Sequence, residues 1–211
     1  MCAARAEAAD MPPGFSRLAD VAPAIVQDIR YAGANHFTGA PVDGYGAASC
    51  WLRDDVARAL ARAAADAARE GLRLVVWDCY RPHRATLAFM RWARDPGAQS
   101  MKQRFYPGVE KSRLFEAGYI GRQSSHSAGT AVDLGLMTAD GREVDFGAPF
   151  DFFDARSATA SAAVSAGARA SRLRLDHLME ARGFRNYPRE WWHYGFATGA
   201  KATIYDVPIA P

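Results

Sequence analysis

Long apolar runs and clustered charge are both missing from this chain. No stretch of its 211 residues approaches the roughly 18 consecutive apolar residues that a membrane-spanning helix needs, so no membrane span is predicted. The net charge of +3 comes from basic residues spread along the chain, without the basic stripe that nucleic-acid binding requires. Hydrophobic residues at 49% and charged residues at 23% are typical of an ordinary globular protein.

Cysteine is scarce, with Cys2, Cys50 and Cys79 the three in the chain. Cys50 precedes a long helical pattern and Cys79 ends the apolar run after it, so a helix and a returning strand would bring both to one end of a layer. Two interpretations stay open. A disulfide would indicate an oxidising compartment, and two buried thiols would be typical of an intracellular enzyme. The cell envelope or periplasm is slightly favoured over the cytoplasm.

The N-terminus lacks the apolar core of a secretory signal peptide. Residues 1–20, which contain Pro12-Pro13-Gly14, are predicted to be a flexible tail. Residues 21–211 are predicted to be one domain, because this length suits a single core. One alternative is an exported chain that begins near its mature N-terminus, with Cys2 as a lipid attachment site.

Apolar periodicity and turn residues predict secondary structure along the whole domain. Strands are predicted over residues 24–31, 72–79, 130–137, 143–146 and 191–196. Helices are predicted over residues 51–70, 83–93 and 164–182, with a shorter piece at 110–117. Asp140-Gly141 is a hairpin turn signal, and Leu173, Leu178 and Met179 are predicted to face the core. The predicted fold class is α+β, a central antiparallel sheet flanked by helices.

Two stretches of the chain place imidazoles near carboxylates. His126 and Asp133 stand seven residues apart among small residues, and Glu190 and His193 follow about sixty residues later. Catalytic zinc sites use three protein ligands of these types and keep a fourth position for water. We therefore predict that His126, Asp133 and His193 hold one Zn²⁺ ion per chain.

Two further residues complete a hydrolytic site. Glu190 would take the proton from the attacking water and pass it to the leaving amine. Arg81, held at a strand end by Pro82, would stabilise the oxyanion. Taken singly, Asp133 is also a typical turn residue and Arg81 a typical structural ion pair, so the prediction depends on the combination.

These residues lie in motifs that resemble the zinc D-alanyl-D-alanine peptidases. The main motif is Ser124-x-His126-x-x-Gly129-x-Ala131-x-Asp133 followed by Glu190-x-x-His193. Further matches, which indicate the VanX-type dipeptidase branch of this hedgehog-like group, are Asp28-x-x-Tyr31-Ala32, Pro41-Val42-Asp43-Gly44-Tyr45, Asp78-x-Tyr80-Arg81-Pro82 and Phe150-Asp151-x-x-Asp154. The resemblance covers about residues 25–196.

The resemblance implies zinc-dependent hydrolysis of the dipeptide D-Ala-D-Ala to two D-alanines, in glycopeptide resistance or in recycling of cell-wall dipeptide. It gives the zinc ligands, Glu190 and Arg81 the roles described above. It also implies that Tyr31, Ser124 and Asp151 line a small cavity, with Asp151 foremost in holding the ammonium of the substrate. Relatives of this kind can form oligomers.

Two positions depart from the family pattern. Cys79 stands where glycine is common, which favours a bridge to Cys50, and Phe146 stands where methionine is common, which would reshape the cavity wall. Two other functions stay open. A D,D- or L,D-carboxypeptidase of peptidoglycan stem peptides shares the metal motif, although an amine site at Asp151 should reject blocked substrates. A zinc-stabilised cell-wall binding module would have no use for Glu190 and Arg81.

Overall fold

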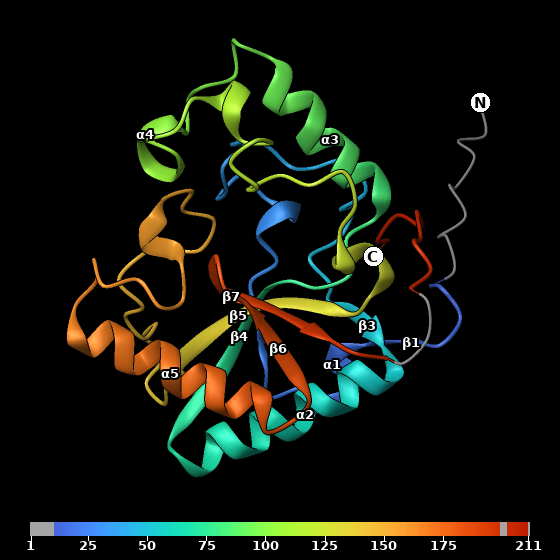
Figure 1. The fold of residues 1–211 in the computed structure, drawn as a ribbon. Coiled ribbons are helices and arrows are strands. Elements are labelled where there is room, and N and C mark those ends of the chain that lie inside the picture. The colour runs from blue at the N-terminus through green and yellow to red at the C-terminus, as the bar shows by residue number, and fades with distance from the viewer. Residues whose placement is uncertain (1–10, 199–201, 211) are drawn as a thin grey trace.

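A five-stranded sheet forms the centre of the protein (Figure 1), in a computed structural model that describes residues 11–198 and 202–210. In spatial order its strands are β2 (Val26–Gln27), β4 (Leu72–Asp78), β5 (Ala131–Thr138), β7 (Glu190–Phe196) and β6 (Phe184–Tyr187). The short strand β2 runs parallel to β4 and the other neighbours are antiparallel, so the sheet is mixed. A separate pair joins β1 (Phe15–Arg17) and β3 (Trp51–Arg53). The predicted α+β class is confirmed.

Helices cover the sheet on one side and enclose a loop-rich region on the other. The long helices α2 (Asp54–Arg69) and α5 (Ala166–Glu180) pack together on one side, and α3 (His83–Arg94) lies on the other (Figure 1). The remaining helical pieces are α1 (Leu18–Val21), α4 (Lys102–Phe105), η1 (Arg30–Ala32), η2 (Lys111–Arg113), η3 (Ser125–Ala128) and η4 (Ala155–Ser157). None of the described helices is long and apolar enough to cross a membrane.

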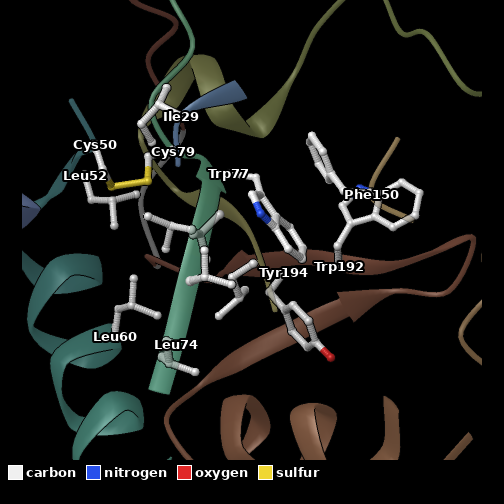
Figure 2. Close-up of a cluster of buried hydrophobic side chains, with 14 of the residues drawn as sticks. Ile29, Cys50, Leu52, Leu60, Leu74, Trp77, Cys79, Phe150, Trp192 and Tyr194 are labelled. Carbon is white, nitrogen blue, oxygen red and sulfur yellow. A yellow bond between two sulfur atoms is a disulfide. The ribbon is translucent and has the colours of Figure 1, made fainter. Parts of the chain in front are cut away.

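Strand β4 is the best-buried element of the sheet. Apart from Arg73, all of its residues are buried, and Figure 2 shows Leu60 of α2 on one side of it and Trp77 and Tyr194 on the other. Burial on both faces explains why this strand reads as a continuous apolar run. Because β4 is fixed in the core, the residues that follow it emerge from a rigid end.

The antiparallel ladder also sets which polar residues meet. Asp133 of β5 lies opposite Asp78 of β4 on one side and opposite His193 of β7 on the other. Residues directly opposite each other in such a ladder have Cβ atoms about 4.5–5.5 Å apart. Three polar side chains are therefore gathered by strand register alone.

A disulfide joins Cys50 and Cys79 in the structure (Figure 2). Cys50 precedes β3 and Cys79 follows β4, and both side chains are buried. The two residues lie at one end of the sheet, as the helix-and-strand argument predicts. The bridge ties β3 to the end of β4.

We expect the double variant Cys50→Ser, Cys79→Ser to lower the free energy of unfolding by about 3.5 kcal/mol, because the bridge closes a loop with a sequence separation of 29. This corresponds to a melting temperature lower by about 7–14 °C, measured by circular dichroism. Cys2→Ser, which keeps the bridge, serves as the control. Thiol titration in denaturant without reductant should find one free thiol, and three would contradict the bridge.

The structure corrects several predicted element boundaries. Residues 51–53 form strand β3 instead of the start of a helix, because they pair with β1, and α2 begins at Asp54. The predicted return strand 143–146 is reduced to a single bridge between Met137 and Glu143. The strand predicted at 24–31 shortens to β2 followed by η1.

Helix α5 contains one wrong assignment to the core. Leu173 is 67% exposed, whereas Leu178 and Met179 are buried as predicted. At 100° per residue, Leu173 lies about 200° around the helix from the buried Leu175, which puts it on the opposite face.

The domain also extends further towards the N-terminus than predicted. Residues 11–20 were assigned to a tail, but Phe15 belongs to β1 and packs edge-on against Tyr80 and Tyr205, and Leu18 is fully buried. These contacts are tertiary, so local composition does not reveal them. Residues 1–10 lie outside the described residues, and with them Cys2, which was considered as an alternative site of lipid attachment.

Candidate active site

Three donor side chains converge where η3 meets β5 and β7. His193 Nδ1 lies 2.9 Å from Asp133 Oδ1, and His126 Nε2 lies 3.2 Å from Asp133 Oδ1 and 3.1 Å from His193 Nδ1. Within residues 11–198 and 202–210, they are the one group of three His, Cys, Asp or Glu residues clustered closely enough for a metal ion.

The triangle of donor atoms fits a tetrahedral metal. Ligands about 2.0–2.1 Å from zinc in tetrahedral geometry stand about 3.3 Å from one another, close to the spacing of these three atoms. The charge state also fits. Burial by itself would raise the pKa of Asp133, but the facing His126 and His193 lower it below its usual range, which keeps the carboxylate ionised.

His126 is aimed by its other ring nitrogen. Its Nδ1 lies 2.7 Å from the carbonyl oxygen of Cys79, so Nε2 is the atom that faces the other two donors. The turn that carries His126 begins at Ser124, whose hydroxyl accepts from the His126 backbone N–H at 3.3 Å, and ends at Gly129 with φ +68°. The contact between Nδ1 and the Cys79 carbonyl oxygen is of the kind that fixes both the tautomer and the ring plane of a metal ligand.

The three donors open onto a cavity of about 320 Å³. All of the predicted site residues line it: Tyr31, Arg81, Ser124, His126, Asp133, Asp151, Glu190 and His193. Phe146 does not lie on this wall. It stacks on Trp191 at 4.0 Å between ring centroids and contacts a different hollow, so the expected reshaping of the cavity by Phe146 is wrong.

Arg81 brings a fixed positive charge to the cavity. Its Nε and Nη2 donate to Asp78 Oδ2 at 3.0 and 2.7 Å, and Nη2 lies 3.8 Å from Asp133 Oδ2. The guanidinium carbon stands 5.2 Å from the ring centre of Tyr31 and 5.1 Å from that of Phe89. Burial opposes the charge and is the largest single influence, but Asp78, with smaller contributions from Tyr31, Tyr45 and Asp133, raises the pKa of Arg81.

Glu190 is the first residue of β7, beside a register shift in the β6–β7 pairing. Its Oε2 lies 4.0 Å from His193 Nδ1. The pKa of this carboxyl is raised to about 7, mainly by burial. The charge of Asp133 also raises it, whereas His193 and Arg81 lower it. A carboxyl group with a pKa near neutrality can both accept and release a proton at physiological pH.

Asp151 has a left-handed backbone with φ +59°, unlike every other non-glycine residue within 11–198 and 202–210. Tyr31 donates its hydroxyl to the Asp151 carboxyl, at 3.1 Å from one oxygen and 2.9 Å from the other. Burial first, and then the charge of Asp133, raises the pKa of Asp151 well above its usual range. A buried carboxyl with such a pKa is stabilised by any cation that enters the cavity.

Several residues of the site were given no role from the sequence, although Asp78 and Tyr45 stand in the family motifs. Asp78 and Tyr45 support it from behind, while Phe89 and Tyr187 line the cavity. The sequence could have pointed to Asp78, because it ends a continuous apolar strand and a buried carboxylate rarely lacks a partner. Nothing in the sequence distinguishes Phe89, because an aromatic residue on an amphipathic helix is typical of any core.

Comparisons with known proteins agree with this site. A peptidase M15 family model described as D-Ala-D-Ala dipeptidase matches residues 11–209. A D-alanyl-D-alanine dipeptidase of Enterococcus faecium is 40% identical over 185 residues, 87% of this chain and 92% of that protein. The dipeptidase of Streptomyces coelicolor is 36% identical over 208 residues, 95% and 100% of the two chains, and that of Escherichia coli is 33% identical over 177 residues, 84% and 81%.

Proposed function

The chain belongs to the D-Ala-D-Ala dipeptidase family of metallopeptidases, and from this premise we propose that it hydrolyses the dipeptide D-Ala-D-Ala to two D-alanines in the cavity around His126, Asp133 and His193. The observation that carries the proposal is the convergence of three donors, a base and an arginine on one cavity. Breakdown or recycling of a cell-wall dipeptide, with glycopeptide resistance as a consequence, is the role that we propose for it.

We propose Zn²⁺ as the metal, held by His126 Nε2, Asp133 Oδ1 and His193 Nδ1. Two imidazoles and one carboxylate are a donor set that suits zinc, and their spacing fits its tetrahedral geometry. When bound, zinc supplies a Lewis acid for the scissile carbonyl and lowers the pKa of the attacking water.

The protein's own side chains then move the protons and balance the charge. Glu190 accepts the proton of the attacking water and gives it to the leaving amine nitrogen, which its pKa of about 7 permits in both directions. Arg81 donates to the oxygen that becomes negative as the carbonyl is attacked. Its charge is permanent, so no proton transfer is needed for this stabilisation.

Recognition of the amino end explains why the substrate is a free dipeptide. The carboxylate of Asp151, held by the Tyr31 hydroxyl, accepts the substrate ammonium, and Ser124 forms the adjoining wall. A cavity of about 320 Å³ lies at the small end of ligand sites, which favours a dipeptide over a stem peptide. The carboxypeptidase alternative is therefore less favoured.

Measuring D-alanine release tests the proposal directly. Purified protein with one zinc per chain should release two D-alanines from D-Ala-D-Ala and leave an N-acetylated tripeptide ending in D-Ala-D-Ala intact. The matched comparison is L-Ala-L-Ala at the same concentration. Zinc-loaded protein that leaves D-Ala-D-Ala intact would overturn the proposal, and faster cleavage of the blocked tripeptide would favour the carboxypeptidase.

The rate should depend on pH through Glu190. The base must be ionised, so we expect kcat/KM to fall about tenfold for each pH unit below its pKa. That pKa is about 7 without metal, and a bound cation shifts it downwards. A pH–rate profile checks this, with zinc content measured at each pH so that loss of metal is recognised. A profile that stays level to below about pH 4, the ordinary pKa of a glutamate, while zinc is retained would contradict the role of Glu190.

A further inference from the structure

Behind Arg81, on the side away from the cavity, lies a carboxylate that does not itself line the cavity. We propose that Asp78 is a positioning residue for the hydrolysis, which holds the Arg81 guanidinium towards the substrate and is itself held by Tyr45. The inference rests on the role proposed above for Arg81.

Both oxygens of Asp78 are committed to different partners. Oδ2 accepts from Nε and Nη2 of Arg81 at 3.0 and 2.7 Å, and Oδ1 accepts from the Tyr45 hydroxyl at 2.5 Å. Asp78 is fully buried at the end of β4, and it is absent from the cavity wall. Oδ2 also lies 3.4 Å from His126 Nδ1, but that nitrogen has its shorter contact, at 2.7 Å, with the Cys79 carbonyl oxygen. The hydrogen bonds of Asp78 therefore connect it to the reaction through Arg81, and zinc content reports any effect through His126.

Arg81 needs such a partner because a second carboxylate competes for it. Its Nη2 lies 3.8 Å from Asp133 Oδ2, and the rings of Tyr31 and Phe89, whose centres are 4.9 Å apart, both pack against one side of the guanidinium. Without Asp78, the one carboxylate left within 4.0 Å of the guanidinium among the described residues is that of Asp133, one of the three donors. A shift of this kind removes the donors from the developing oxyanion, and displacements of about 1 Å are costly to catalysis.

Tyr45 is delivered to Asp78 by a loop whose shape is itself fixed. Gly44 has φ +96°, and a Cβ there would lie 3.0 Å from the Pro82 side chain, so the loop packs closely against the residue that follows Arg81. The backbone N–H of Ile209 donates to the carbonyl of Gly44 at 2.8 Å, and Tyr45 forms an isolated bridge with Ile209. The backbone at Tyr45 is therefore positioned by the contacts of its loop with Pro82 and with Ile209.

The test compares single and double variants by kcat, KM and zinc content for D-Ala-D-Ala. Asp78→Asn should keep one zinc per chain, lower kcat about ten- to one-hundredfold and change KM little, because hydrogen bonds to a charged group are involved. Tyr45→Phe, which is milder and preserves the ring, should lower kcat about three- to tenfold. Adding Asp78→Asn to Arg81→Ala should lower kcat no further, because the effect passes through Arg81.

A structural role predicts a different pattern, in which Asp78→Asn lowers kcat by the same factor with and without Arg81. That result, or an unchanged kcat in both Asp78→Asn and Tyr45→Phe, would overturn the inference. Tyr194→Phe is the matched control, since Tyr194 is equally buried but its hydroxyl has no hydrogen-bond partner within the described residues. It should leave kcat unchanged.

A measurement that does not depend on catalysis separates this inference from the proposed function. In metal-free protein, the Nε–H of Arg81 should exchange slowly with solvent by NMR in the wild type and in Tyr194→Phe, and faster in Asp78→Asn and Tyr45→Phe. Slow exchange in all four would overturn the positioning role. If Arg81→Ala hydrolyses the dipeptide at the wild-type rate, the proposed role of Arg81 fails, and the NMR comparison still tests the contact.

Discussion

Replacing Glu190 with glutamine is expected to lower kcat for D-Ala-D-Ala by about 10²- to 10⁴-fold, the range that a positioned general acid–base group contributes. Glutamine preserves the size and the hydrogen-bonding oxygen of Glu190 but cannot carry the proton from water to the leaving amine. Because burial already disfavours the charged carboxyl, the neutral amide should not destabilise the fold. Steady-state kinetics on the zinc-loaded variant gives the measurement.

The metal content decides how this loss is interpreted. Glu190 lies beside His193 but outside the triangle of donors, so the variant should retain one zinc per chain. Glu180→Gln, an exposed glutamate at the end of α5, controls for the general effect of the substitution. Loss of zinc together with activity would make Glu190 a ligand, and a rate within tenfold of the wild type would remove it from proton transfer.

The charges around the cavity explain why the site needs cations. Asp133, Asp151 and Glu190 line it with Arg81 as the fixed cation on the wall, and that arginine is already paired with Asp78. The raised pKa values of Glu190 and Asp151 reflect this burial of unpaired carboxyl groups. We infer that a divalent metal at one end of the cavity and the substrate ammonium at the other neutralise these carboxylates. Metal and dipeptide then stabilise different carboxylates of one cavity.

The elements with strong periodicity or clear stop signals could be predicted from sequence. Helix α2 ends beside Gly71, and β4 and α3 match their predicted ranges within one residue. Strands β1, β3 and β6 were missed because three or four residues give too little pattern, and their pairing is decided by partners distant in the chain.

The site shows the same division between local and tertiary information. The predicted site residues all line one cavity, because their spacing in motifs reflects strand ends and turns. The contact between Tyr45 and Asp78 joins residues 33 positions apart through a loop, so no local pattern reveals it. The position of Phe146 on another hollow likewise depends on how Trp191 packs.

Replacing Asp151 with asparagine is the second large expected effect. The ammonium of the substrate then loses its buried partner, and breaking a buried ion pair costs about 3–5 kcal/mol, equivalent to a fall in kcat/KM of about 10²- to 10³-fold or more. Zinc content should be unchanged, because Asp151 is not one of the three clustered donors. Kinetics with D-Ala-D-Ala and with its N-acetyl derivative measure the effect.

The melting temperature of Asp151→Asn should not fall with its activity. The pKa of Asp151 is raised in the folded protein, so the folded state holds this proton more tightly than the unfolded chain, and the cost of ionising the group grows as the pH rises from about 4 towards the folded-state pKa. Asparagine removes that cost while still accepting from Tyr31, so the melting temperature at neutral pH should stay level or rise. Asp154→Asn is the matched control, because Asp154 caps η4 and pairs with Arg156 away from the cavity. If Asp151→Asn unfolds at lower temperature and the loss of kcat/KM is the same for the blocked dipeptide, Asp151 is structural and the amine site lies elsewhere.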